Sequence, residues 1–469
     1  MTNKTSNVQT NQGLKLNLKR TFIIGLAFFG ILLLWQVYDA NCPILLTELF
    51  MEYMPQAEQE SEVQYLVGVI MALDNLAALI LLPIFGHLSD KTKTPIGKRM
   101  PYILVGTLVS AIAFPFIPLC FYWNNLAGMV SVMGIVVIFM MMYRNPAVAL
   151  MPDITPKPLR AKANGIINIM GYLGGACATV LGLFLIVSDF SNPDSGWAYQ
   201  NIWVIELPFL IASILMVITC LVLFFKIKEL PLEKELARDM KEGEKESEVD
   251  ASTVGPKEKM SKKNLITLIL ILAAEVCWFM CDNGLNTYLG NYLVYYMGTK
   301  SSMANTVVLI GGVASVIGFA VGGIIADKIS RKWTIFLGLA LYFVAVFWLC
   351  FVRPNGIPEG SRVASLPWDF YPIWIIKGFG IALVNTCSYP MVVELSTKDK
   401  VGKFTGYYYA ASMSAQTITS VLLGLLLFAQ SWWSLPVYCT VFIGLSLLIF
   451  FFVRSKRKVN KETKTLEGK

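Results

Sequence analysis

The sequence predicts an all-α polytopic membrane protein with twelve transmembrane helices, and three observations carry this prediction. Of the 469 residues, 55% are hydrophobic and only 15% are charged, whereas a soluble domain has about 25% charged residues. The mean hydropathy is +0.59, which excludes a disordered chain and an ordinary soluble enzyme. Twelve apolar stretches are long enough for the roughly 20 residues that cross a bilayer. They lie at residues 21–50, 62–86, 101–123, 127–150, 162–187, 201–226, 264–297, 303–326, 333–352, 371–393, 402–428 and 433–453.

The loops between these stretches alternate in charge. Of the 39 lysines and arginines, 34 fall in the two tails and in every second loop, and only three fall in the loops between. The remaining two, Arg144 and Lys377, lie inside spans. Positive residues mark the cytoplasmic side of a helical membrane protein. We therefore expect a multi-pass protein of the cell membrane with both termini in the cytoplasm, which requires an even number of spans.

A long hydrophilic stretch divides the chain into two halves of six spans each. Lysine and glutamate dominate residues 227–263, a composition that is typical of a solvated, partly helical linker without chemistry of its own. We expect an N-terminal six-helix bundle at 1–226, this cytoplasmic linker, and a C-terminal six-helix bundle with a cytoplasmic tail at 264–469.

No set of residues in the sequence indicates catalysis or a bound cofactor. The nine cysteines lie in or beside apolar segments and lack the spacing of metal ligands. The lone histidine, His87, is next to a loop, and the phosphate-loop, Rossmann and HExxH patterns are absent. The net charge of +8 resides in loops, where it serves orientation and not nucleic-acid binding. We expect no enzyme activity, no metal and no cofactor.

Short motifs recur in the two halves. The segment GHLSDK at 86–91 follows the second span, and GIIADK at 323–328 follows the eighth. Repeated halves are expected of transporters that alternate access around a central site. A G-x-x-x-D-[KR] pattern in both loops, together with the six-plus-six topology, resembles the major facilitator superfamily. This resemblance implies the major facilitator fold, with twelve helices in two six-helix bundles.

The first half also resembles a narrower family. The segments GHLSDKTKTPIGKRMPYILVGT at 86–107 and YRNPAVALMPDITPKPLRAKANGIINIMGYLGG at 143–175 are similar to the glycoside–pentoside–hexuronide:cation symporters and the related sucrose:proton symporters. The resemblance implies a sugar-class substrate. It fails at the sodium site, because Leu82 and Ala78 occupy the positions of two sodium-coordinating aspartates, and Arg144 occupies that of a sugar-binding aspartate. We therefore expect a proton as the coupling ion.

Ionisable side chains inside a span are costly, so they usually face a cavity or an opposite charge. Asp74 lies near the middle of its span and is either a proton-carrying carboxylate or the partner of Arg144 in a salt bridge. Glu275 and Asp282 are seven residues apart and share one helical face, which either lines a cavity or makes fixed interhelical hydrogen bonds. Asp39 is expected nearer the outer surface, where solvation is the alternative. The proton-coupling candidates are Asp74, Asp39, Glu275 and Asp282.

Polar and aromatic side chains of the spans are candidates for binding a sugar, since amides and charged groups bond hydroxyls and rings cover C–H faces. Any one aromatic residue is more often part of the core or of an interface belt, and Lys377 either enters the pocket or snorkels outward. The substrate-binding candidates are Arg144, Trp35, Gln36, Tyr38, Asn164, Asn168, Asn283, Asn385, Lys377 and Gln416.

Charged residues at the repeated loops are candidates for a cytoplasmic gate. Charge-assisted hydrogen bonds between such residues hold two halves together in one conformation. The gate candidates are Asp90, Lys91, Arg99, Asp327 and Arg331.

The predicted function is proton-coupled symport of a di- or oligosaccharide, such as sucrose, maltose or another glucoside, by alternating access. The expected partners are the sugar, a proton and the lipid bilayer, and the expected state is a monomer. The alternative is a proton-antiport exporter of drugs or metabolites, which the 20 methionines, three of them at 140–142, keep open. A sugar site should be rich in polar groups, and a drug site rich in Met and Phe.

Overall fold

The computed structural model describes residues 14–156, 159–252, 262–354, 363, 365–395 and 401–453. Twelve spans in this part of the chain are long and apolar enough to cross a membrane, which confirms the predicted all-α polytopic fold. Helices suit this environment because every backbone N–H and C=O in a bilayer needs a partner within the protein. The helices are α1 (Leu18–Tyr53), α2 (Gln64–Lys91), α3 (Met100–Ala113), α4 (Phe116–Tyr122), α5 (Leu126–Asp153), α6 (Arg160–Phe184), α7 (Ile202–Lys226), α8 (Glu229–Ser252), α9 (Lys262–Asn291), α10 (Ser302–Ile329), α11 (Arg331–Leu349), α12 (Phe370–Glu394), α13 (Val401–Gln430) and α14 (Ser434–Phe451).

Two of these helices share one span. The predicted span 101–123 is divided into α3 and α4 at Pro115, whose missing N–H and fixed φ interrupt the ladder of helical hydrogen bonds. Four short helical turns, Glu60–Val63, Val187–Asp189, Pro193–Ala198 and the π-helical Tyr292–Tyr296, complete the helical elements of the described chain.

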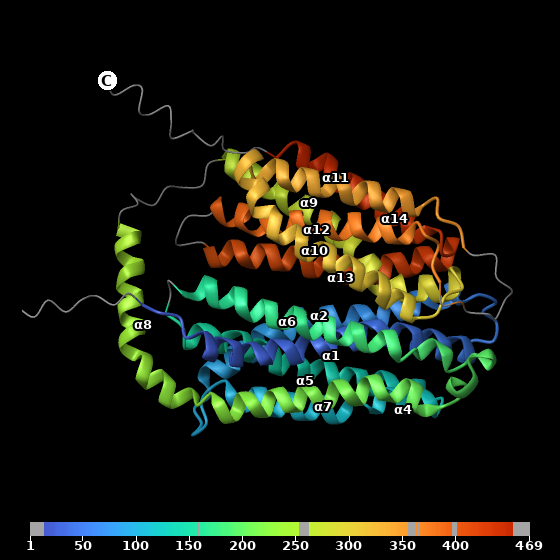
Figure 1. The fold of residues 1–469 in the computed structure, drawn as a ribbon, viewed down its shortest axis with the longest axis horizontal. Helices are drawn as coiled ribbons and strands as arrows, with labels where there is room; N and C mark the ends of the chain where they lie inside the picture. Colours follow the sequence, from blue (N-terminus) through green and yellow to red (C-terminus); the bar gives the residue numbers. More distant parts are fainter. Residues whose placement is uncertain are drawn as a thin grey trace, which may run out of the picture.

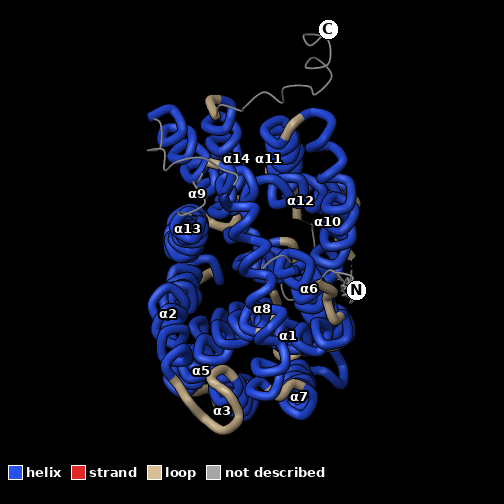
Figure 2. The backbone as a smooth tube through the Cα atoms, turned by 90° about the vertical axis from the view of Figure 1, so that its left-hand side faces the viewer, coloured by secondary structure: helices blue, strands red, loops and turns tan. Residues whose placement is uncertain are grey.

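The transmembrane helices form two groups, each around its own buried apolar cluster. Helices α1–α7 form the first bundle and α9–α14 the second, and Figure 1 shows the two lying side by side. Figure 2 looks along the helices and shows α8 crossing in front of them. The bundles meet where α2 packs against α13, α6 against α10 and α1 against α9.

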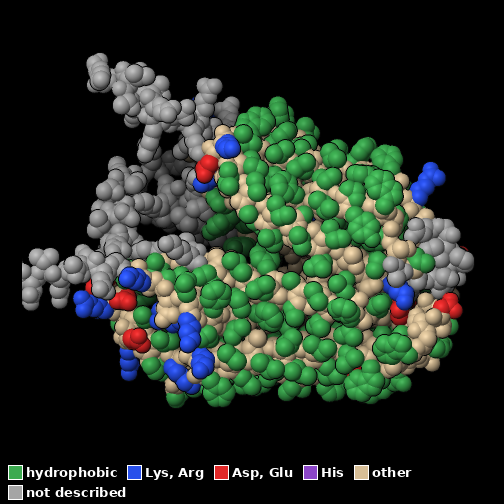
Figure 3. Space-filling model, in the orientation of Figure 1, with side chains coloured by type: hydrophobic (Ala, Val, Ile, Leu, Met, Phe, Trp, Pro, Cys, Tyr) green, Lys and Arg blue, Asp and Glu red, His purple; other side chains and the backbone are tan. Residues whose placement is uncertain are grey.

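The helix α8 identifies one end of the molecule, here called the α8 end; the other is called the opposite end. Hydrophobic side chains cover the flank of the molecule between these ends, and charged side chains gather at the ends themselves (Figure 3). Such an apolar band with polar ends is the surface expected of a protein that spans a bilayer. Figure 3 also shows a hollow between the two bundles, nearer the α8 end.

At the opposite end, polar contacts join the two bundles. Asn291 of α9 donates from Nδ2 to Oε1 of Gln64 at 2.8 Å and to Oγ1 of Thr47 at 2.9 Å. The Lys300 ammonium lies 2.9 Å from a carboxylate oxygen of Asp189. Gln64, Thr47 and Asn291 are fully buried, so these hydrogen bonds satisfy the Asn291 Nδ2 donor and its acceptors where water does not reach.

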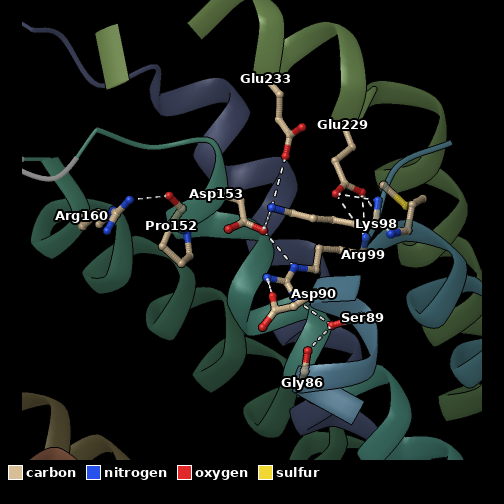
Figure 4. A network of polar contacts seen from close by, with 11 residues as sticks. Gly86, Ser89, Asp90, Lys98, Arg99, Pro152, Asp153, Arg160, Glu229 and Glu233 are labelled. Carbon is tan, nitrogen blue, oxygen red and sulfur yellow. Dashed lines mark hydrogen bonds and ion pairs between the residues drawn. The ribbon is translucent and has the colours of Figure 1, made fainter. Parts of the chain in front are cut away.

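At the α8 end, a network around Arg99 ties together parts of the first bundle (Figure 4). Arg99 is only 5% exposed. Its guanidinium donates to Oδ2 of Asp153 at 2.9 Å, to Oγ of Ser89 at 2.6 Å and to the Asp90 carboxylate. Lys98 adds an ion pair to Asp153 at 3.2 Å. The ends of α2, α3 and α5 are therefore held together by one cation with a rigid fork of donors.

The helix α8 begins by capping α3. The Glu229 carboxylate accepts hydrogen bonds from the backbone N–H groups of Lys98, Arg99 and Met100 at 3.0–3.2 Å, which are donors that the first turn of a helix leaves unpaired. This approach requires Gly97, because a Cβ there would lie 2.1 Å from Oε2 of Glu229, and its φ is +117°.

Apolar side chains of α8 extend this contact. Leu232, Leu236 and Met240 recur every four residues and pack against the apolar cluster of the first bundle. The first three turns of the predicted solvated linker are therefore an attached part of that bundle.

Candidate functional site

A cavity of about 230 Å³ lies between the two bundles. Two of its walls come from α1 and α2 of the first bundle, and two from α9 and α13 of the second. Eight of its eleven lining residues are polar, which is unusual inside a bilayer, where such groups are expensive and mark substrate and ion pathways. The lining residues are Trp35, Asp39, Met71, Asp74, Asn75, Phe279, Asp282, Asn283, Asn286, Thr287 and Gln416.

The α9 wall is a single helical face. Phe279, Asp282, Asn283, Asn286 and Thr287 follow each other at intervals of three, one, three and one residues, the spacing of neighbours on one side of an α-helix. This face places an aromatic ring, a carboxylate and two amides in the cavity within two helical turns.

The α1 wall contributes Trp35 and Asp39, one helical turn apart. Because α1 continues to Tyr53, Asp39 lies near the middle of the helix, and its side chain is exposed in the cavity. Asp39 lies in the half of α1 that is nearer the opposite end, so its expected position nearer the outer surface stays a prediction, but its surroundings are those of the cavity. Tyr38 was expected to bind substrate, but it is fully buried and does not line the cavity; its ring stacks on that of Trp35, with centroids 5.5 Å apart.

Asp74 of α2 lines the cavity and is 7% exposed. Tyr38 donates a hydrogen bond from its hydroxyl to Oδ1 of Asp74 at 3.1 Å. The predicted alternative, a salt bridge between Asp74 and Arg144, does not form in this conformation. Instead Arg144, which is partly buried, interacts electrostatically with Asp39 of α1 and Tyr409 of α13.

Asp282 is held by fixed partners within the second bundle. The Lys377 ammonium of α12 lies 2.8 Å from its Oδ1, the Tyr342 hydroxyl of α11 donates to the same oxygen at 3.0 Å, and Asn286 donates to Oδ2 at 3.2 Å. Of the two interpretations, these contacts favour interhelical hydrogen bonding, although Asp282 also lines the cavity. Lys377 points inward to its counter-ion and does not snorkel.

Glu275 lies one turn from Phe279 on the same side of α9, nearer the α8 end. It is fully buried, and neither carboxylate oxygen has a hydrogen-bond partner among the described residues. It interacts electrostatically with Tyr408 and Tyr409 of α13. Glu275 is therefore covered by the second bundle and does not line the cavity in this conformation.

Several substrate candidates also lie away from the cavity. Asn164 and Asn168 are exposed on α6, Asn385 is exposed on α12, and Gln36 is partly buried on α1, but none lines the cavity. Asn283 and Gln416 do line it, as do Trp35, Asp39, Asp74 and Asp282. The structure thus brings together candidates from four helices that are far apart in the sequence.

Five lining residues were not among the candidates: Met71, Asn75, Phe279, Asn286 and Thr287. Helical spacing from the candidates would have found four of them. Met71 lies three residues before Asp74, Phe279 and Asn286 lie three before and four after Asp282, and Thr287 lies four after Asn283. Asn75, the residue next to Asp74, is the one that this spacing does not find.

The gate candidates divide into two groups. Asp90 and Arg99 form part of the network at the α8 end, with Asp153 as the partner that the candidates omitted. Lys91 is exposed beside them. Asp327 and Arg331 lie in the second bundle, where both interact electrostatically with Cys387.

Burial and ion pairing shift the pKa values of two side chains at the α8 end, Glu229 and Lys98. Burial raises the pKa of Glu229, and the backbone N–H donors of α3 oppose this shift without cancelling it. Burial lowers the pKa of Lys98, but its ion pairs with Asp153 and Glu233 outweigh that effect, so the pKa is raised overall. No group of three His, Cys, Asp or Glu side chains in the described residues is placed to hold a metal ion.

Comparisons with known proteins agree with this architecture. A family model described as the Major Facilitator Superfamily matches residues 27–355 and 292–469. A crystal structure of a peptide transporter POT in complex with alafosfalin superposes with a TM-score of 0.64 at 13% identity, covering 93% of each chain. The nucleoside transporter NupG superposes with a TM-score of 0.62 at 11% identity, covering 93% of this chain and 100% of its own. At these identities the structures show a shared fold. None of the curated proteins matches the sequence.

Proposed function

The chain belongs to the Major Facilitator Superfamily and is a multi-pass membrane transporter, not an enzyme, and we propose that it imports a di- or oligosaccharide together with a proton. The observation that carries this proposal is the polar, amide-rich lining of the cavity between the bundles. Amide and carboxylate groups bond sugar hydroxyls, and the rings of Trp35 and Phe279 offer apolar faces for the C–H surfaces of a sugar.

The alternative of a drug exporter has less support from the cavity. A drug site should be rich in Met and Phe, whereas this lining contains one of each, Met71 and Phe279. Met140 and Met141, which kept the alternative open, are buried in the apolar cluster of the first bundle. The methionines there fill a helical core and do not surround a ligand.

Transport would use alternating access, with the bundles rocking about the cavity. Basic residues assign the α8 end to the cytoplasm, and with it both termini of a monomer in the cell membrane. Because polar contacts join the bundles at the opposite end, we interpret this conformation as inward-facing. The two moving units would be 1–226, with the attached start of the 227–263 linker, and 264–469.

The coupling proton would bind at Asp74 or Asp39. Both carboxylates line the cavity, and neither makes an ion pair with a described residue like that between Asp282 and Lys377. A sodium ion requires several oxygen ligands, and Leu82 and Ala78 lie where sodium-coupled relatives carry carboxylates. Asp282 would act mainly as the counter-ion of Lys377, and Glu275 would be reached only when the second bundle rearranges.

Counterflow in proteoliposomes tests the proposal. Vesicles loaded with one unlabelled compound are diluted into its labelled form, with a panel of sucrose, maltose, other glucosides, a dipeptide and a nucleoside. We expect counterflow with a glucoside, and accumulation that follows an imposed pH gradient and ignores sodium. Counterflow with the dipeptide or nucleoside alone would reject the sugar, and sodium-driven accumulation would reject the proton.

Variants of Asp74 sharpen this test. Asp74→Asn should abolish accumulation driven by the pH gradient but keep part of the counterflow, because exchange needs no net movement of protons. Asn75→Asp, which instead adds a carboxylate to the same wall, serves as the matched variant. Full accumulation by Asp74→Asn would exclude Asp74 as the proton carrier.

A further inference from the structure

Tyr38 lies between the cavity and the interior of the first bundle. Its side chain is fully buried, so it cannot touch a ligand in the cavity as it stands. One side of it contacts Trp35, whose ring is nearly parallel at 15° and which lines the cavity. Its hydroxyl contacts Asp74, which lines the cavity from α2. Tyr38 therefore connects a candidate sugar platform to a candidate proton site.

We propose that Tyr38 is a positioning residue that couples substrate contact at Trp35 to the proton on Asp74. This inference rests on the proposed function, a symport of sugar and proton through this cavity. It goes further by assigning the physical link between the two ligands to a residue that binds neither of them.

The chemistry of the link is a donated hydrogen bond. The Tyr38 O–H donates to Oδ1 of Asp74, and a hydrogen bond to the charged form of a carboxyl favours that form. Other groups near Asp74 are Asp39 and Cys42 of α1, with Arg144 reaching Asp39 from α5. Asp282, held by Lys377, lies across the cavity on α9. Among the described residues, Tyr38 is the side-chain donor to Asp74.

The geometry of α1 carries the effect of the ligand to this bond. Trp35 and Tyr38 are three residues apart and so lie on one side of the helix. A sugar that packs against Trp35 displaces its ring, and the stacked Tyr38 ring follows because close-packed interiors transmit displacement. The Tyr38 hydroxyl then moves relative to Oδ1, the ionised carboxylate loses stabilisation, and Asp74 takes a proton from the water in the cavity.

The coupling is reciprocal. If bound sugar raises the proton affinity of Asp74, bound proton must raise the sugar affinity by the same factor. Release of the sugar restores the hydrogen bond, and the proton leaves Asp74 for water at the α8 end. One proton enters and one leaves in each cycle, without any covalent step.

The test replaces Tyr38 by phenylalanine, which keeps the ring and removes the donor. Sugar is added to purified, weakly buffered protein over a pH series, and proton uptake and sugar affinity are both measured. For Tyr38→Phe, we expect the proton uptake that sugar causes to be largely lost, because the hydrogen bond that sugar would weaken is already absent. The sugar affinity at acid pH should remain within about twofold of the wild type, since Asp74 is protonated there and the bond from Tyr38 stabilises only the ionised carboxylate.

Tyr143→Phe is the matched control. Tyr143 is another buried tyrosine of the first bundle, and its hydroxyl donates to the carbonyl oxygen of Ala27. Its loss should affect stability alone and leave the sugar-dependent proton uptake unchanged. A second variant, Trp35→Phe, weakens the stack while keeping an aromatic wall, and should make the sugar affinity less dependent on pH.

The outcomes separate this inference from the proposed function. A wild type that takes up no proton with any sugar contradicts both. A wild type that does so, together with a Tyr38→Phe variant of unchanged pH profile, contradicts only the role of Tyr38. A more than tenfold loss of sugar affinity at acid pH in Tyr38→Phe would show that Tyr38 itself contacts the sugar. If Tyr38→Phe does not fold, an unchanged pH dependence in Trp35→Phe overturns the coupling.

Discussion

Polar contacts hold both ends of this transporter, but only those at the opposite end join the two bundles to each other. At the opposite end, Asn291 and Lys300 of the second bundle bond to Gln64 and Asp189 of the first. At the α8 end, the contacts around Arg99 remain within the first bundle and its attached helix α8. Contacts between moving units set which conformation is populated, whereas contacts within a unit set how rigid that unit is.

This difference has a consequence for the transport cycle. Under the proposed alternating access, the contacts at the opposite end must break each time the bundles open there, so they can be worth only a few kcal/mol in total without stopping transport. The Arg99 network need not break as the bundles rock, so it can be as strong as folding requires. Substitutions at the two ends should therefore have different kinds of effect.

The largest expected effect comes from locking the opposite end. Lys300→Cys with Asp189→Cys, in a variant that lacks the nine native cysteines, can be joined by a short flexible bismaleimide. We expect the cross-linked protein to lose transport almost completely, because the bundles can no longer separate there. Counterflow before and after cross-linking measures the loss.

A matched pair at the same end controls for the chemistry. Tyr53 and Asn124 both belong to the first bundle, where the Tyr53 hydroxyl donates to the Asn124 carbonyl oxygen at 2.8 Å. Cross-linking Tyr53→Cys to Asn124→Cys should leave transport largely intact. Equal loss in both pairs would mean that the comparison of the two ends is wrong.

The next effect is on stability at the α8 end. Arg99→Ala removes the shared partner of Asp90 and Asp153, and we expect it to cost about 2 kcal/mol, below the usual cost of breaking a buried pair because the Asp90 side chain is 58% exposed. Arg99→Lys should recover part of this loss, since a single ammonium cannot reproduce three directed bonds. Thermal unfolding of the purified protein measures both variants, and no change in Arg99→Ala would contradict a structural role.

A smaller effect is expected on the balance of conformations. Asp189→Asn removes the ion pair with Lys300, and because the Lys300 side chain is 27% exposed, we expect a shift of about 1 kcal/mol, or roughly fivefold, toward opening of the opposite end. Spin labels at Tyr53 and Trp433, exposed positions in the two bundles, would report the longer distance by pulsed electron resonance. Arg99→Lys with the same labels should not show this shift.

The sequence predicts the fold well because membrane insertion depends on local properties. Apolar stretches and basic loops report spans and orientation without any knowledge of packing, and the twelve predicted spans match those of the described chain. The cavity-lining face of α9 could also be predicted in part, since Asp282 and Asn283 indicate which side of that helix is polar.

The remainder of the site depends on helix rotation and on contacts distant in sequence. Helix α1 is apolar on most sides, so nothing in its pattern indicates that Trp35 faces the cavity while Tyr38 faces inward. Asn164 and Asn385 were expected to bind substrate but do not line the cavity. A polar residue in a span does not indicate which conformation exposes it to the pathway. The hydrogen bond that the Arg99 backbone N–H donates to Glu229 joins residues 130 positions apart, and no local sequence pattern indicates such a contact.

The smallest expected effect concerns Glu229 and separates charge from capping at the α8 end. Burial raises its pKa in the folded protein above the ordinary value of 4.5. A group whose pKa is raised on folding stabilises the protein fully below its unfolded pKa, and this contribution is lost as the pH rises through the folded value. Glu229→Gln keeps an oxygen that accepts from the N–H groups of α3 but cannot titrate. We therefore compare the midpoints of thermal unfolding of the wild type and of Glu229→Gln at each pH. The midpoint of the wild type minus that of the variant should fall by a degree or two between acid and neutral pH. Glu242→Gln, on an exposed turn of α8, controls for the loss of a negative charge. If this difference in midpoint rises with pH instead, the N–H donors outweigh burial in setting the pKa of Glu229.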